Sequence, residues 1–285
     1  MRLLMPPQSN LFRFFVLFLA LAGLTPIAYF VAVEVVPVKA ASGSDDAAES
    51  ANSSGFDRYI DNVAFGLGEH LEFDVTYGFI TAGSATMSVD RLIEFENRPC
   101  YRIVTTANSN SFFSTFYNVD DRVESIIDAI GLFSWRFEKN LKEGKYRATR
   151  KFSFDQRNHK AEYNNDTTTV PPYVQDALSV FYYVRTQDLK VGESVFVDHY
   201  NDGKLYPMEI KVLKKETITV PAGTFECLVI EPLLQSVGVF KHEGKLKVWL
   251  TNDRLRLPVL MKSKVLIGSI AAELTSYKLG EIESF

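Results

Sequence analysis

Two consecutive segments, LEFDVTYGF (residues 71–79) and ITAGSATMSV (residues 80–89), predict the class of the fold. A period of two is typical of a strand with one buried and one solvated face. Alternation resumes after Ala82-Gly83, so we predict a hairpin with its turn at these two residues. The alternating apolar residues of the first strand are Leu71, Phe73, Val75, Tyr77 and Phe79.

The same alternation recurs as far as residue 274, and turn signals rich in Gly, Asn and Pro separate the segments. Regular short strands with such turns predict a mainly all-β fold. We therefore expect one antiparallel sheet curled into a barrel, half-barrel or sandwich. The further alternating sets are Phe133/Trp135/Phe137, Val195/Val197, Tyr206/Met208/Ile210/Val212, Leu246/Val248/Leu250, Val259/Met261 and Ile270/Ala272/Leu274.

One segment departs from this period and predicts an amphipathic helix near residues 173–186, after Pro171-Pro172. Proline suits a first helical turn, and Asp176 near that end complements the helix dipole. We expect the helix to fill the interior of the curled sheet, as a plug, or to cover its open end, as a lid. Its aromatic face either contacts a ligand or packs in the core, and such stripes more often pack. The candidate ligand or lid face consists of Leu178, Phe181, Tyr182 and Arg185.

Residues 1–40 are predicted to be a signal peptide or an N-terminal membrane anchor. Positive charges precede an apolar run over residues 14–33, about 20 residues and enough to cross a bilayer. Its length favours an uncleaved anchor, whereas the small residues around Ala40 favour a cleaved signal. Both predict export of the rest of the chain. Residues 14–33 would contact the membrane if uncleaved.

Residues 41–55 are small and acidic and lack a large apolar residue, so we expect a flexible linker. Regular β patterning begins after this segment. We therefore assign residues 56–285 to a single β domain.

The chain has 285 residues with 31 basic and 35 acidic side chains, and this acidic balance argues against a nucleic-acid-binding protein. Its four histidines lack metal-ligand spacing, and no motif of a serine hydrolase or nucleotide-binding protein occurs. The adjacent carboxylates Asp120 and Asp121 point to opposite faces of a strand, so only one can join a given site. We predict no cofactor, no metal and no catalytic residue, and we favour a protein that is not an enzyme.

Cys100 and Cys227 both flank β-patterned segments, and an exported protein can keep a disulfide. A bridge between them is one candidate. Sequence alone does not place them within bonding distance, and two buried free thiols are the favoured alternative.

Residues 142–160 carry seven basic side chains with aromatic residues between them. Clustered cations attract anions locally, so this segment is a candidate patch for a polyanion or a lipid headgroup. The favoured alternative is the solvated outer face of two strands. The candidate anion patch consists of Lys145, Arg147, Arg150 and Lys151.

The order of short motifs from residue 68 to residue 259 resembles the DUF3108 family of exported bacterial proteins without an assigned function. This resemblance implies a β-rich domain on the envelope side and carries over no catalytic residue. The matching motifs are GEHLEF (68–73), AGSA (82–85), FD (154–155), VPP (170–172), DALSVFYYVR (176–185), PAGTF (221–225), WLTND (249–253) and PV (258–259).

Three classes of function follow from these observations. The leading hypothesis is a non-enzymatic envelope protein whose curved sheet binds a lipid or another amphiphile. The second is a scaffolding protein that binds another envelope protein or a glycan. The third is a hydrolase that acts on glycan or lipid with carboxylates that sequence does not pair.

Overall fold

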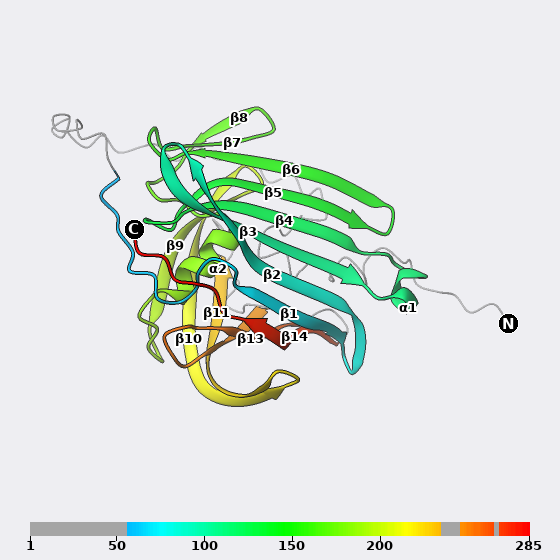
Figure 1. The fold of residues 1–285 in the computed structure, drawn as a ribbon. Helices are drawn as coiled ribbons and strands as arrows, with labels where there is room; N and C mark the ends of the chain where they lie inside the picture. Colours follow the sequence, from blue (N-terminus) through cyan, green and yellow to red (C-terminus); the bar gives the residue numbers. More distant parts are fainter. Residues whose placement is uncertain (1–55, 235–245, 265–267) are drawn as a thin grey trace, which may run out of the picture.

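This computed structural model describes residues 56–234, 246–264 and 268–285, and the expected membrane segment and linker lie outside them. Within these ranges the chain forms 14 strands and two short helices (Figure 1). In chain order the elements are β1 (His70–Tyr77), β2 (Ile80–Phe95), β3 (Arg98–Ser109), α1 (Ser111–Ser114), β4 (Asp120–Asp128), β5 (Ser134–Glu143), β6 (Tyr146–Asp155), β7 (Lys160–Tyr163), β8 (Asp166–Thr169), α2 (Ala177–Arg185), β9 (Ser194–Asn201), β10 (Lys204–Val220), β11 (Gly223–Leu234), β12 (Leu246–Thr251), β13 (Pro258–Lys264) and β14 (Ser269–Lys278).

All the strands belong to one antiparallel sheet with the order β8-β7-β6-β5-β4-β3-β2-β1-β14-β13-β12-β11-β10-β9. Because β1 pairs with β14, the first and last strands meet in the middle of the sheet. The sheet curves around α2 (Figure 1), and its edge strands β8 and β9 do not pair with each other. The predicted fold, mainly all-β with a curled antiparallel sheet, is confirmed.

The period of two in the sequence separates the two faces of the sheet. In β1, Leu71, Phe73 and Val75 are almost fully buried, whereas Glu72 is exposed. The buried side chains of β1 belong to one continuous apolar cluster with residues of β2, β3 and β10–β14 and with α2. This cluster is the main core, and it lies on the inner face of the curved sheet.

β1 and β2 form the predicted hairpin, but the turn lies at Gly78 and Phe79 rather than at Ala82-Gly83. Gly78 has a φ of 61°, in the left-handed region that favours glycine. Gly83 lies inside β2, where a Cβ would come 2.1 Å from the carbonyl oxygen of Asn108 on β3. Its lack of a side chain thus permits a close approach between two strands.

The predicted alternation of Phe133, Trp135 and Phe137 is interrupted by a shift in register. The pairing of β4 with β5 slips by one residue between Ile126 and Ile127. Phe137 belongs to the main core, whereas Phe133 and Trp135 pack in a separate apolar cluster with the beginning of the described chain. A bulge of this kind re-aims side chains that a strict period would place together.

Helix α2 begins at Ala177 and ends at Arg185, within the predicted range of 173–186. The helix starts after Asp176, whose side chain accepts hydrogen bonds from the backbone N–H groups of Leu178 and Ser179. Pro171-Pro172 therefore precede the helix instead of forming its first turn. Eight of the nine residues are buried, so the helix lacks the solvated face that an amphipathic pattern predicts.

A buried ion pair fixes the other end of α2. Two nitrogens of the Arg185 guanidinium donate to the two carboxylate oxygens of Glu69, each at 2.7 Å. The same guanidinium also donates to the backbone carbonyls of Ala64 and Leu255. Both charged side chains are 0–1% exposed, so each charge needs the other to offset the free-energy cost of its burial.

We expect Glu69→Ala to lower the free energy of unfolding by about 3–5 kcal/mol, because it leaves Arg185 buried without its anion. The matched control is Glu72→Ala, since Glu72 is half exposed and contacts His70 and the Ser276 hydroxyl at the surface. Urea unfolding of the full chain, followed by Trp fluorescence, measures both. Equal unfolding midpoints for the two variants would contradict the assigned role.

Candidate functional site

The two edges of the sheet meet through side chains and form what we call the seam. It joins β9 and the turn after it (Asp202) to β5, β6 and β8. Arg150 on β6 donates to Asp202 at 2.7 Å, and Lys139 on β5 donates to the Asn201 side chain at 2.9 Å. Tyr200 on β9 packs edge-on against Phe152 and Phe154 of β6. The seam thus combines ion pairs with aromatic packing.

The backbone immediately before α2 also forms hydrogen bonds with the free edge of β9. Gln175 donates to the carbonyl of Asp198 and accepts from the N–H of Tyr200, at 2.9 Å in each case. This isolated parallel bridge satisfies part of the β9 edge that no strand covers. The position of β9 therefore depends on the residue that precedes the cap of α2.

Lys139 is the most buried cation of the seam. Its ammonium lies 5.5 Å and 5.3 Å from the ring centres of Phe137 and Phe152, and 3.7 Å from Asp202. Burial lowers its pKa to about 8, although the carboxylate of Asp202 acts in the opposite direction. Burial alone would lower the pKa of Arg150. Its hydrogen bond to the same Asp202 carboxylate, and the charge of that carboxylate, outweigh burial and raise the pKa.

His199 lies on β9 between these groups and is 1% exposed. Burial and, to a smaller extent, the charge of Lys139 lower its pKa to about 4, so the ring is neutral at neutral pH. Its Nδ1 atom has no hydrogen-bond partner among the described residues. A buried polar atom in this state is costly, and it marks a place in the seam where hydrogen bonding is incomplete.

A second polar group lies where β4 and β5 approach the β5–β6 turn. Asp120 is exposed and Asp121 is buried, as the alternation predicts. Asp121 accepts a hydrogen bond from the backbone of Lys142 at 2.7 Å, and burial raises its pKa to about 6. Glu143 hydrogen-bonds to the same carboxyl group. Both acids are buried, so this pair does not face an open cleft.

The candidate anion patch is divided between different parts of the molecule. Lys145 and Arg147 are exposed at the β5–β6 turn. Arg150 belongs to the seam, and Lys151 on the outer face pairs with Glu138 at 3.2 Å. Neighbouring residues of β6 point to opposite faces, so a cluster in sequence does not become one surface.

The candidate ligand face of α2 is packed inside the protein. Leu178, Phe181, Tyr182 and Arg185 are 0–8% exposed. Tyr182 contacts Phe65 edge-on, with ring centres 4.7 Å apart, and Arg185 pairs with Glu69. These side chains therefore fill one end of the curved sheet in this structure.

The two cysteines do not form the candidate disulfide, because both are free and buried. Cys100 on β3 belongs to the smaller apolar cluster, and Cys227 on β11 belongs to the main core. Five strands separate β3 from β11 in the sheet order. Burial raises the pKa of both thiols, that of Cys100 to about 12 and that of Cys227 to about 11, and makes both unreactive.

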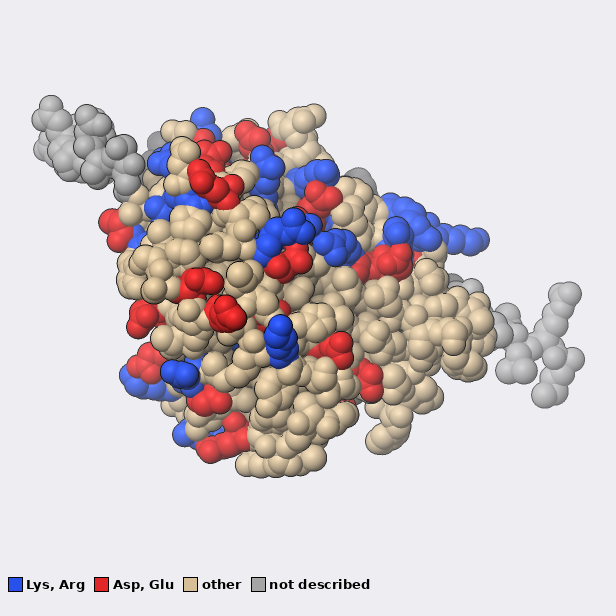
Figure 2. Space-filling view, viewed as in Figure 1, with Lys and Arg blue, Asp and Glu red and all other residues tan. Residues whose placement is uncertain are grey.

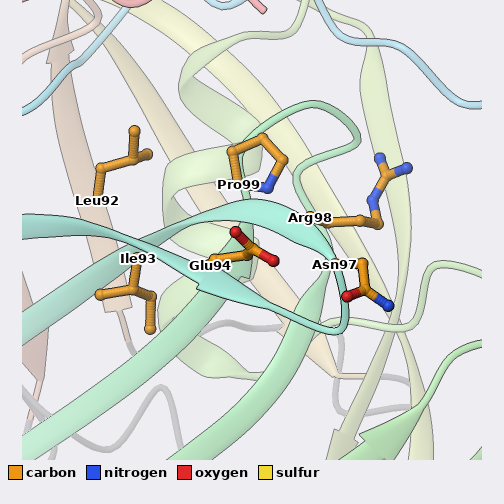
Figure 3. Close-up of a pocket in the computed structure, with 6 residues that line it drawn as sticks. All are labelled: Leu92, Ile93, Glu94, Asn97, Arg98 and Pro99. Carbon is orange, nitrogen blue, oxygen red and sulfur yellow. The ribbon is translucent and has the colours of Figure 1, made fainter.

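An open pocket of about 430 Å³ lies beside the β2–β3 turn (Figure 3). Its polar groups do not converge: Arg98 extends away from Glu94 in Figure 3 and pairs with the buried carboxylate of Asp128. Among the described residues no group of three His, Cys, Asp or Glu side chains is arranged to hold a metal ion. The pocket is lined by Leu92, Ile93, Glu94, Asn97, Arg98 and Pro99.

A family model described as a protein of unknown function, DUF3108, matches residues 72–275. The chain belongs to the DUF3108 family. This confirms the resemblance seen in the sequence. The matched range includes the whole seam and α2, whereas Glu69 precedes it. No curated protein matches this DUF3108 chain significantly.

Several solved structures are similar to the DUF3108 chain at low identity. A β-barrel-like DUF1849 protein from Brucella abortus has 8% identity and a TM-score of 0.45, covering 76% of this chain and 100% of that chain. A DUF1089 protein from Pseudomonas aeruginosa has 8% identity and a TM-score of 0.37, covering 64% and 90%. A candidate lipoprotein from Parabacteroides distasonis has 12% identity and a TM-score of 0.33, covering 78% and 100%.

Sequence reasoning missed the seam, although one signal pointed to it. Lys139 follows Phe137 by two residues, so the alternation places its charge on the inner face. A lysine at an inward position needs a buried partner. Its partners Asn201 and Asp202 are about 60 residues away in the sequence, on the other edge of the sheet. Their approach depends on the curvature of the whole sheet.

We expect acid to destabilise the DUF3108 protein through His199. Its folded-state pKa lies below the ordinary value, so the unfolded chain binds a proton that the fold excludes between pH 6.5 and about 4. The stability contributed by the neutral ring is complete above pH 6.5 and is lost as the pH falls through that window. The free energy of unfolding should fall between pH 7 and pH 5, and His199→Gln should make this fall smaller by about 2 kcal/mol.

Urea unfolding at the two pH values measures this difference. His70→Gln is the control, because the His70 side chain is 45% exposed. A His199→Gln variant with the same pH dependence as the wild type would exclude His199 as the titrating group.

Proposed function

We propose that this DUF3108 protein is an exported, non-enzymatic protein of the bacterial cell envelope that holds the apolar part of a lipid or another amphiphile inside its curved sheet. The observation that carries the proposal is the seam. In a closed barrel every strand is hydrogen-bonded to two neighbours, and opening it breaks a ladder. Here β8 and β9 do not pair with each other, and no backbone ladder joins the two edges, which meet through side chains.

The chemistry of the inner face supports an apolar occupant. One apolar cluster lines that face from β1 to β14. It includes small and adaptable side chains on adjacent strands, namely Ala85 and Met87 on β2, Ala107 on β3, and Ala272 on β14. Small residues leave room, and methionine adapts its shape to irregular partners.

The polar groups of the seam supply a place for the other end of an amphiphile. Lys139 and Arg150 bring two cations to the boundary of the apolar interior. A carboxylate or phosphate that approaches from outside would meet them before its apolar chain enters. An amphiphile fits this order of surfaces better than a purely polar glycan does.

Export is supported by the N-terminal apolar run over residues 14–33, which is preceded by basic residues. This run lies outside the described residues. Among the described residues no helix is long and apolar enough to cross a bilayer. The proposed location is the periplasm or the periplasmic face of the inner membrane.

The test compares two tryptophan substitutions on neighbouring residues of β2. Ala85 is buried on the inner face and Ser84 is exposed on the outer face. We expect the full chain, purified from its native host in mild detergent, to carry a stoichiometric amphiphile detectable by mass spectrometry of an organic extract. Ser84→Trp should retain it, and Ala85→Trp should lose at least nine-tenths of it.

Circular dichroism and urea unfolding establish whether Ala85→Trp folds, and Ala85→Leu replaces it if it does not. The proposal fails if the wild type carries no more amphiphile than the folded inner-face variant. It also fails if every lipid in the wild-type extract occurs in equal amounts in Ser84→Trp and Ala85→Trp. Such lipids would come from the detergent micelle around the protein.

A further inference from the structure

Four large apolar side chains are exposed together at the end of the sheet opposite α2. Phe79 is fully exposed at the β1–β2 turn, and Ile80 beside it is 58% exposed. Phe112 on α1 and Phe116 just after it are 64% and 72% exposed. Isolated exposed apolar residues are ordinary, but a contiguous group of them marks a contact surface.

Hydrogen bonds hold the two segments side by side. The side-chain amide of Asn110 donates to the carbonyl of Thr81 at 2.7 Å, and its backbone N–H donates to Ala82 at 2.9 Å. The Asn110 side chain also accepts from the backbone of Phe113 and so begins α1. One residue thus fixes the aromatic helix next to the β1–β2 turn.

The segments that carry these side chains have no charge. Residues 75–83 and residues 103–119 contain no Asp, Glu, Lys or Arg. A surface without charges avoids the desolvation cost that charged groups would meet at a hydrocarbon boundary.

A basic turn adjoins this apolar end. Gly144 in the β5–β6 turn donates to the carbonyl of Asn118 at 2.7 Å, which joins the turn to the segment after α1. The turn presents the exposed cations Lys142, Lys145 and Arg147. Figure 2 shows basic atoms at the right end of the molecule, acidic atoms directly below them, and a largely uncharged surface farther down, in the region where Figure 1 places α1 and the β1–β2 turn.

Charge complementarity decides which partner this surface fits. Of the three cations, Lys142 pairs with Asp120 at 2.7 Å, and the nearby acids Asp121 and Glu143 are buried. The exposed charged side chains at this turn are therefore three cations and one anion, on a chain whose formal net charge is −4. A symmetric contact with a second copy would bring two positive turns into one interface, which their repulsion opposes.

We propose that this end, the rim formed by Phe79, Ile80, Phe112, Phe116 and the β5–β6 turn, docks the protein on an anionic lipid bilayer. The aromatic side chains enter the interface between headgroups and acyl chains, and Lys145 and Arg147 contact anionic headgroups. The docking places the rim on the membrane and α2 away from it. It does not depend on whether a ligand occupies the inner face.

The chain before the described residues is long enough for this orientation. The described chain begins at Phe56, which packs on Phe133 near the α2 end. Residues 34–55 span on the order of 70 Å when fully extended. Phe56 lies in the same apolar cluster as Phe95, at the end of the 16-residue strand β2 that is remote from Ile80. The extended segment exceeds the length of that strand, which is about 50 Å. An anchor over residues 14–33 would therefore still allow the opposite end to reach the bilayer.

The experiment places an environment-sensitive fluorophore on the rim of the full chain. The label is attached at Phe79→Cys, and a control label at Arg254→Cys marks the α2 end, where the neighbouring Leu255 contacts Arg185. The buried thiols Cys100 and Cys227 make the unsubstituted chain the background control. Each protein is reconstituted in vesicles of equal parts phosphatidylcholine and phosphatidylglycerol, with a spin-labelled lipid as the quencher.

We expect blue-shifted emission and strong lipid quenching at position 79, with water-like emission at position 254. Lys145→Glu with Arg147→Glu should lower the docked-to-undocked ratio at least tenfold, because each cation contributes about a fivefold factor at an anionic surface. Vesicles of phosphatidylcholine alone should give the same loss. Equal quenching at positions 79 and 254, or unchanged quenching after the charge reversal, would overturn the proposal.

Discussion

The closure of the sheet depends on a helix that is held at both ends by buried ionisable side chains. At the beginning of α2 the fully buried carboxyl of Asp176 accepts hydrogen bonds from two backbone N–H groups and from the hydroxyls of Ser125 and Ser134. Burial raises its pKa. At the other end Arg185 pairs with Glu69. These contacts link α2 to β4, to β5 and to the chain before β1.

The seam follows from this arrangement. Gln175 immediately precedes the capping residue, and its backbone makes two hydrogen bonds to β9. A fixed α2 therefore fixes one edge of the sheet against the other. Lys139, Asn201 and Asp202 then meet because β5 and β9 are held at the right separation. The polar site is a consequence of the helix and not an independent motif.

The parts of the fold that local patterns control could be predicted from the sequence. The alternation of β1 and the hairpin with β2 are examples, because a half-buried strand imposes its period on the residues it contains. The exact turn was not predictable, since Gly78 and Gly83 look alike in sequence and differ only in backbone conformation and neighbours. The bulge that separates Trp135 from Phe137 was also hidden, because register depends on the partner strand. The candidate site was missed for the same reason, since Lys139 and Asp202 meet only when the whole sheet has curved.

The seam differs from the boundaries between paired strands of the described sheet. Separating any two paired strands would break a continuous ladder of backbone hydrogen bonds, whose groups would then need new partners. Separating β9 from the opposite side of the seam breaks the Arg150–Asp202 pair and the contact of Tyr200 with Thr168, both of which are partly accessible to water. Partly exposed contacts of this kind each contribute on the order of 1 kcal/mol. The separation also breaks the buried Lys139–Asn201 hydrogen bond and the packing of Tyr200 on β6. The edges are also joined in sequence by the segment that carries α2, and the backbone of Gln175 in that segment holds β9. Among the described strands the seam is therefore the boundary that depends on side chains and on the position of α2 instead of on a continuous backbone ladder.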